Sequence, residues 1–121
     1  GVTVDEARAT LHELLADRSY TALFTGSNPI TIGALKAINA LSLAVPDDLS
    51  LLAFDDFEWL TLVPPFISAI RQPAGQIGRE ALRQLVAQIE GERIGQPHVL
   101  FPADTMLRHS TMPPCLDAPG R

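Results

Sequence analysis

The sequence is poor in cysteine, in lysine and in long apolar runs, and each shortage argues against a class of protein. The single cysteine, Cys115, excludes an intrachain disulfide and fits a reducing compartment. Lys36 is the only lysine and the formal net charge is −5, whereas gripping a phosphate backbone requires clustered lysine and arginine. No apolar run approaches the roughly 18 residues of a membrane span. We therefore expect a cytoplasmic chain with no membrane contact and no DNA contact of its own.

Motifs of catalysis and metal binding are lacking as well. The three histidines, His12, His98 and His109, lie far apart in the sequence and show no metal-ligand spacing. The sequence has no G-x-S-x-G elbow, no phosphate-binding P-loop and no G-x-G-x-x-G turn. A phosphoacceptor receiver domain would need a lysine at a late strand end, but Lys36 falls within a predicted helix. We expect no enzyme, no metal and no cofactor.

What the chain does have is ample apolar content, in segments that alternate between helix and strand patterns. Hydrophobic residues make up 46% of the chain and the mean hydropathy is +0.15, which suffices for a packed core. The short apolar run 51–57 (LLAFDDF) predicts a strand that is covered on both faces. The alternation predicts an α/β fold, a largely parallel sheet flanked by helices. The predicted helices run from near Thr3 to 17–19, over 28–43 and over 73–91, the predicted strands span 20–25, 49–54, 66–71, 99–101 and 105–107, and the tail 112–121 is expected to be disordered.

Local signals mark where the predicted helices begin and end. Thr3 and Glu6 have the spacing of a capping box, which predicts a helix start at Thr3. Asn28 suits the N-cap of the second helix, with Pro29 at its first helical position. Gly91 predicts the end of the third helix.

Polar side chains follow three of the predicted strands, at the points where those strands end. The carboxyl ends of parallel strands meet at one edge of a sheet, where open α/β folds bind their ligands. Carboxylate, amide and guanidinium groups at such an edge suit a hydroxyl-rich ligand, and a tryptophan offers an apolar face to a sugar ring. The alternatives are a hydrated strand end and a tryptophan that is simply packed or lies at an interface. The candidate binding residues are Ser27, Asn28, Asp55, Trp59, Arg71 and Gln72.

Three runs of sequence resemble, in the same order, the effector-binding domain of the lactose/galactose repressor family. They are ALFTGSNPITIGALKAINALSLAVPDDLSLLAFDD, PPFISAIRQPAGQIGREALRQLV and LFPADTMLRHST, and the likeness covers residues 1–111. It implies a periplasmic-binding-protein-like fold of type I, with two α/β lobes and a cleft between them. Residues 1–71 would be second-lobe material, 73–91 a helix that crosses to the first lobe, and 98–111 the returning strands. Most of the first lobe and a DNA-binding head would then lie outside this chain, which looks like a piece of a longer protein.

The resemblance also implies a function. The chain would be the ligand-binding and dimerisation region of a transcription regulator that senses a small molecule, most simply a sugar. Operator DNA would be bound only by the absent N-terminal helix-turn-helix domain. The alternative is a periplasmic sugar-binding protein of the same fold, although the closing run LRHST favours the regulator.

Individual positions can be carried over from the family. Asp55 matches the aspartate that hydrogen-bonds the effector, and Asp56 is expected to face the opposite way along the strand. Ser27-Asn28 stands where the family usually has Asn-Asp, so one carboxylate is absent and the resemblance does not name the effector. The residues carried over to the dimer interface are Ile32, Leu35, Lys36, Leu60, Leu62 and Val63.

Overall fold

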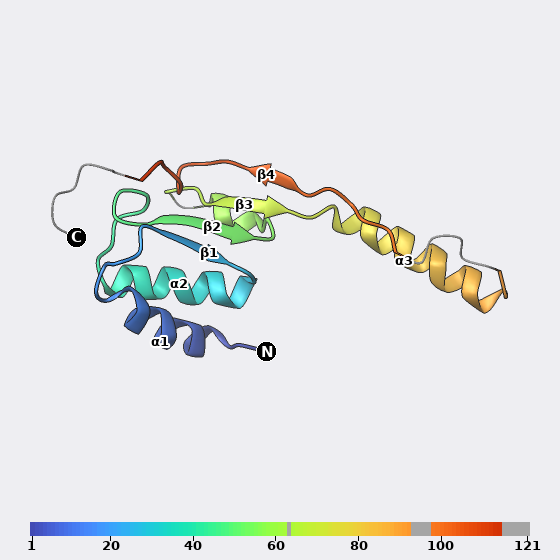
Figure 1. Ribbon diagram of the computed structural model, residues 1–121, viewed down its shortest axis with the longest axis horizontal. Helices are drawn as coiled ribbons and strands as arrows, with labels where there is room; N and C mark the ends of the chain where they lie inside the picture. The colour runs from blue at the N-terminus through green and yellow to red at the C-terminus, as the bar shows by residue number, and fades with distance from the viewer. Residues whose placement is uncertain (63, 93–97, 115–121) are drawn as a thin grey trace.

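The computed structural model describes residues 1–62, 64–92 and 98–114, and it has the predicted α/β organisation (Figure 1). The sheet has the order β1-β2-β3-β4, in which β1, β2 and β3 are parallel and β4 is antiparallel to β3. None of the helices in these described ranges is both long enough and apolar enough to cross a membrane. In chain order the elements are α1 (Val4–Leu15), β1 (Ala22–Thr25), α2 (Asn28–Ala40), β2 (Ser50–Phe54), a 3-10 helix (Glu58–Thr61), β3 (Ser68–Arg71), α3 (Ala74–Ile89) and β4 (Asp104–Met106).

The start of α1 is the predicted capping box. The backbone N–H of Thr3 donates to the Glu6 carboxylate at 2.8 Å, and the N–H of Glu6 donates to the Thr3 hydroxyl at 3.3 Å. These bonds satisfy N–H groups that have no partner within the helix. The helix ends at Leu15, earlier than predicted, and Arg18 beyond it adopts a left-handed backbone with a φ of 57°.

The start of α2 differs from the prediction by one residue. Ser27 is the N-cap, its side chain makes no capping hydrogen bond, and Asn28 is the first helical residue. The asparagine side chain is instead bonded to Trp59, whose indole N–H donates to Asn28 Oδ1 at 3.1 Å. The helix ends at Ala40, short of the predicted residue 43.

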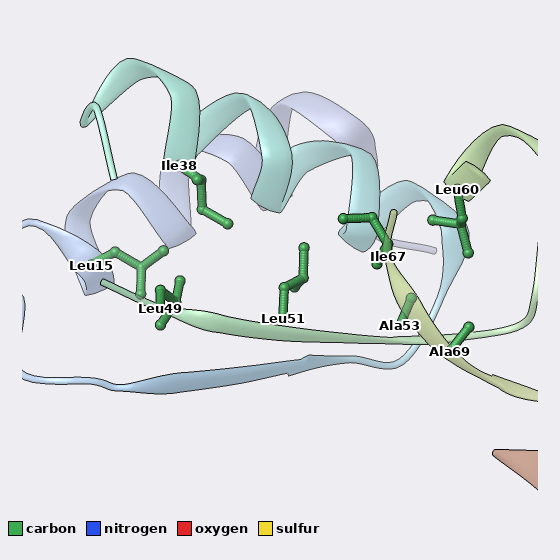
Figure 2. Close-up of a cluster of buried hydrophobic side chains, with 8 residues drawn as sticks. All are labelled: Leu15, Ile38, Leu49, Leu51, Ala53, Leu60, Ile67 and Ala69. Atoms are coloured by element: carbon green, nitrogen blue, oxygen red, sulfur yellow. The ribbon is translucent and has the colours of Figure 1, made fainter. Parts of the chain in front are cut away.

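The hydrophobic core lies between the two N-terminal helices and one face of the sheet (Figure 2). Leu51 and Ala53 of β2 point into it, whereas Leu52 and Phe54 on the other face stay partly exposed. The expectation that this strand is covered on both faces is therefore wrong for the described chain. The prediction of a buried first strand is also wrong. β1 is an edge strand of the sheet, and its Phe24 is 57% exposed. The core residues are Leu15, Ile38, Leu49, Leu51, Ala53, Leu60, Ile67 and Ala69.

The C-terminal third differs most from the predicted elements. Residues 99–101 form no strand, so β4 is the one returning strand within 98–111. Residues 98–101 instead line a hollow together with Ile77 and Ala81 of α3. The tail is bonded at its start, since the N–H of Met112 donates to the Ser50 hydroxyl at 3.1 Å. Residues 115–121, which include Cys115, lie outside the described residues.

The helix α3 extends beyond the carboxyl end of β3, away from the other two helices (Figure 1). It ends as predicted at a glycine, Gly91, whose φ of 76° is left-handed. One buried residue, Ala87, lies among exposed apolar side chains that a monomer rarely leaves in water. That surface suits the crossover helix predicted from the resemblance, whose assignment to two lobes stays a prediction. The exposed apolar residues of α3 are Ile77, Leu82, Leu85, Val86 and Ile89.

The close approach of α1 and α2 predicts a large effect of a single methyl group. A Cβ at Gly33 would lie 2.6 Å from the Cβ of Ala7 and 2.8 Å from the carbonyl oxygen of Val4. We expect Gly33→Ala to lower the free energy of unfolding by about 2–3 kcal/mol, because the helices must separate. Gly78→Ala on α3 is the control: its Cβ meets nothing within 4 Å, so better helix propensity should leave stability unchanged or raise it by about 1 kcal/mol. Urea denaturation followed by circular dichroism measures both, and equal stability of Gly33→Ala and wild type would contradict this packing.

Candidate functional site

The parallel pairing of β1, β2 and β3 brings the predicted polar residues to one edge of the sheet. Thr25 pairs with Ala53, and Ala53 pairs with Ala69. Two residues further along the three strands are Ser27, Asp55 and Arg71, which therefore lie at the same edge of the sheet. The expected convergence of strand ends is present, and ligand binding by these residues stays a prediction.

Asp55 is held at this edge by two hydrogen bonds. It has a left-handed backbone with a φ of 71°, which aspartate tolerates better than most residues do. Its N–H donates to the carbonyl of Ile70 at 2.9 Å, and its Oδ1 accepts a hydrogen bond from the Gln72 amide at 2.7 Å. Among the described residues nothing hydrogen-bonds Oδ2, so this half-buried carboxylate has an oxygen left for a ligand hydroxyl.

Arg71 and Trp59 form their polar contacts with residues other than Asp55. Arg71 pairs with β4, where its Nη2 lies 3.1 Å from Asp104 Oδ2, and both side chains are at least half exposed. Trp59 packs against the core, bonds Asn28 and lines surface hollows beside Leu35 of α2. Ser27, Asp55 and Gln72 thus lie at the carboxyl edge of the sheet, whereas Trp59 lies beside the predicted dimer surface.

Asp56 has a role that the sequence did not reveal. Its carboxylate forms an ion pair with Arg108, whose Nη2 lies 2.7 Å from Oδ1 and 2.9 Å from Oδ2. The two side chains are only 10% and 16% exposed. Arg108 Nη1 also donates to the carbonyl of Ile67 at 2.6 Å. Arg108 belongs to the run LRHST, which marked the family resemblance without a role for any one residue.

The same closing run attaches the end of the chain to the middle of the sheet. The buried Ser110 hydroxyl donates to the carbonyl of Leu51 at 2.6 Å and accepts from the N–H of Ser68 at 2.8 Å. The N–H of Leu51 donates to the Ser110 carbonyl at 2.7 Å. These bonds satisfy polar groups that are costly to bury unpaired. The closing run therefore stabilises the sheet as well as marking the family resemblance.

The predicted dimer-interface residues fall into four groups. Ile32, Leu35 and Lys36 line one surface hollow with Asn39 and Trp59. Leu62 is 68% exposed. Leu60 is 1% exposed and belongs to the core, so its prediction as an interface residue is wrong. Val63 lies outside the described residues.

Comparison with known proteins matches this arrangement to a family. Residues 2–111 match the model of a periplasmic binding protein-like domain. The transcriptional regulator PtxS of Pseudomonas aeruginosa is 39% identical over 92 residues, which cover 76% of this chain and 27% of PtxS. The chain belongs to the periplasmic binding protein-like domain family, in its LacI-type branch. It spans about a quarter of the length of PtxS.

Solved structures of LacI-type regulators share the fold. A LacI-family regulatory protein from Chloroflexus aggregans is 32% identical, with a TM-score of 0.77 over 91% of this chain and 40% of its own. The regulator CelR, solved as a cellobiose complex, is 29% identical, with a TM-score of 0.79 over 90% of this chain and 34% of its own. These matches confirm the predicted fold and family.

Two Arg–Asp pairs that differ in burial, Asp56–Arg108 and Arg71–Asp104, predict contrasting effects on stability. Asp56→Asn and Arg108→Met each leave a largely buried charge without its counter-charge. Each should therefore lower the free energy of unfolding by about 2–4 kcal/mol. Asp104→Asn and Arg71→Met break an exposed pair and should cost less than about 1 kcal/mol. Urea denaturation of the four variants provides the comparison. Similar losses for both pairs would show that the burial of the Asp56–Arg108 pair does not matter.

Proposed function

We propose that this chain is the effector-binding and dimerisation region of a LacI-type transcription regulator that senses a sugar or sugar derivative. The observation that carries the proposal is the carboxylate of Asp55 at the carboxyl edge of three parallel strands, oriented by Gln72. Such an edge is where open α/β folds place their ligands. The region binds its ligand without chemically changing it, so it is not an enzyme.

A sugar suits the groups at this edge. A carboxylate accepts hydrogen bonds from neighbouring hydroxyls, and charge-assisted bonds of this kind are stronger than neutral ones. Ser27 adds a hydroxyl that both donates and accepts, and the Asn28 amide supplies donors. The CelR structure, which holds cellobiose, supports a sugar as the class of ligand.

The regulatory step follows from differential binding. An effector that binds the closed arrangement of two lobes more tightly shifts the population towards it, and DNA-binding heads respond to that shift. The heads would lie N-terminal to this chain, whose net charge of −5 does not suit DNA. Cytoplasmic location follows from that role.

A thermal-shift screen tests the ligand class. The full-length protein is heated with a panel of mono- and disaccharides, cellobiose among them, and of nucleosides as the contrasting class. We expect at least one sugar to raise the melting temperature in a concentration-dependent way, because a ligand that binds only the native state stabilises it. Stabilisation by nucleosides alone, or by no compound of the panel, would contradict the proposal.

Asp55 provides the residue-level prediction. Asp55→Asn keeps a side chain that tolerates the left-handed backbone and removes the charge, so it should weaken binding of the stabilising sugar by about 1.5–3 kcal/mol, about tenfold to a hundredfold. Asp47→Asn, at the opposite end of β2, is the control and should bind like wild type. Isothermal titration calorimetry measures both affinities. Unchanged binding by Asp55→Asn would place the ligand elsewhere.

Dimerisation through the surface beside α2 predicts an effect of one exposed leucine. Leu62 is 68% exposed and follows the 3-10 helix that carries Trp59, so an aspartate there would meet an apolar partner surface. Leu62→Asp should convert a dimer to a monomer in analytical ultracentrifugation of the full-length protein. Leu107→Asp, at a comparably exposed position after β4, should leave the dimer intact. A Leu62→Asp protein that stays dimeric would exclude this surface.

A further inference from the structure

We propose that Asp56 and Arg108 are positioning residues for Asp55, and that together with Gln72 they make its orientation depend on α3 and β4. The inference rests on the proposed function in one respect only, namely that Asp55 contacts the effector. The ion pair, the hydrogen bonds and the connections along the chain are features of the structure itself.

Asp55 needs external support to keep its backbone conformation. A left-handed backbone is unfavourable for a residue with a Cβ, and such a conformation persists where its surroundings hold it. The N–H of Asp55 is bonded to the carbonyl of Ile70, which fixes the preceding peptide. The carboxylate of Asp56 is held by Arg108, which fixes the following residue. Asp55 is thus restrained from both sides along the chain.

Arg108 is itself fixed by three contacts. Its Nη1 donates to the Ile67 carbonyl at 2.6 Å and its Nη2 contacts the Asp56 carboxylate. Its backbone N–H donates to the Ser68 hydroxyl at 2.9 Å. A planar guanidinium can make both side-chain contacts at once, whereas a lysine ammonium cannot reproduce that fork. The pair therefore sets the path of the chain after β2 relative to the start of β3.

These contacts connect Asp55 and Asp56 to α3 and β4. Gln72, which donates to Asp55, precedes α3 by two positions, and Arg108 follows β4 by two positions. The chain thus leaves the sheet towards α3 beside Asp55 and returns from β4 beside Asp56. Figure 1 shows α3 extending from this edge and β4 coming back along β3. A shift of α3 and β4 relative to β2 would act on both aspartates.

A ligand-free measurement tests the positioning directly. Amide hydrogen exchange of the full chain is compared among wild type, Arg108→Met, Arg108→Lys and Arg71→Met. The Leu51 amide, which is bonded to Ser110, serves as the internal reference. In Arg108→Met we expect exchange of the Asp55 amide to become about tenfold faster relative to this reference, because the chain around Asp55 can then open locally without the rest of the sheet. Arg108→Lys should show a smaller increase. Arg71→Met, which breaks the exposed Arg71–Asp104 pair, should show no increase. Equal acceleration at Asp55 and Leu51, or no acceleration at Asp55, would overturn the proposal.

A double-mutant cycle on sugar affinity separates positioning of Asp55 from a purely structural role of the ion pair. The probe is the sugar with the largest thermal shift in the panel above, titrated by calorimetry well below the melting temperature of each variant. Arg108→Met should weaken binding by about tenfold in the presence of Asp55 and have no further effect in an Asp55→Asn background, because coupled residues are non-additive. An equal loss in both backgrounds, or no loss, would overturn the proposal. If no sugar binds the wild type, the proposed function fails, and the exchange measurement alone decides the positioning.

Discussion

Parallel pairing of β1, β2 and β3 is the constraint on which the rest of the structure depends. Parallel neighbours cannot be joined by a tight turn, so the chain must cross back over the sheet between them. Between β1 and β2 that crossing is α2, which packs with α1 and closes the core on one face (Figure 2). The same pairing brings Ser27, Asp55 and Arg71 to one edge. Core and candidate site are thus two results of one arrangement.

Buried polar contacts add what apolar packing does not supply, namely a defined path for the end of the chain. Ser110 is bonded to Leu51 and Ser68, and Arg108 to Asp56 and Ile67. Hydrogen bonds of this kind contribute modestly when made but are costly when one partner is lost. They explain why a short polar run that closes the chain is tied to the centre of the sheet.

The sequence predicted what local patterns determine. The capping box at Thr3, the glycine stop at Gly91 and the strand ending near Asp55 depend on neighbouring residues and agree with the structure. The Asp56–Arg108 pair joins residues 52 positions apart and has no local signal. Leu60 appears in the sequence as one more apolar loop residue, and only tertiary packing shows that it is buried. The exposed face of β1 likewise depends on strand order, which no local pattern encodes.

We propose that this sheet edge forms one wall of a sugar-binding cleft. Hydrogen–deuterium exchange of the full-length protein, with and without a saturating sugar effector, tests it most directly. We expect slower exchange confined to the amides around Ser27, Asp55 and Gln72, because a bound ligand holds the strand ends closed. Amides of α1, on the far side of the core, should be unaffected. Slower exchange at the hollow beside Leu35 and Trp59, without slower exchange at Asp55, would contradict a binding cleft at this edge.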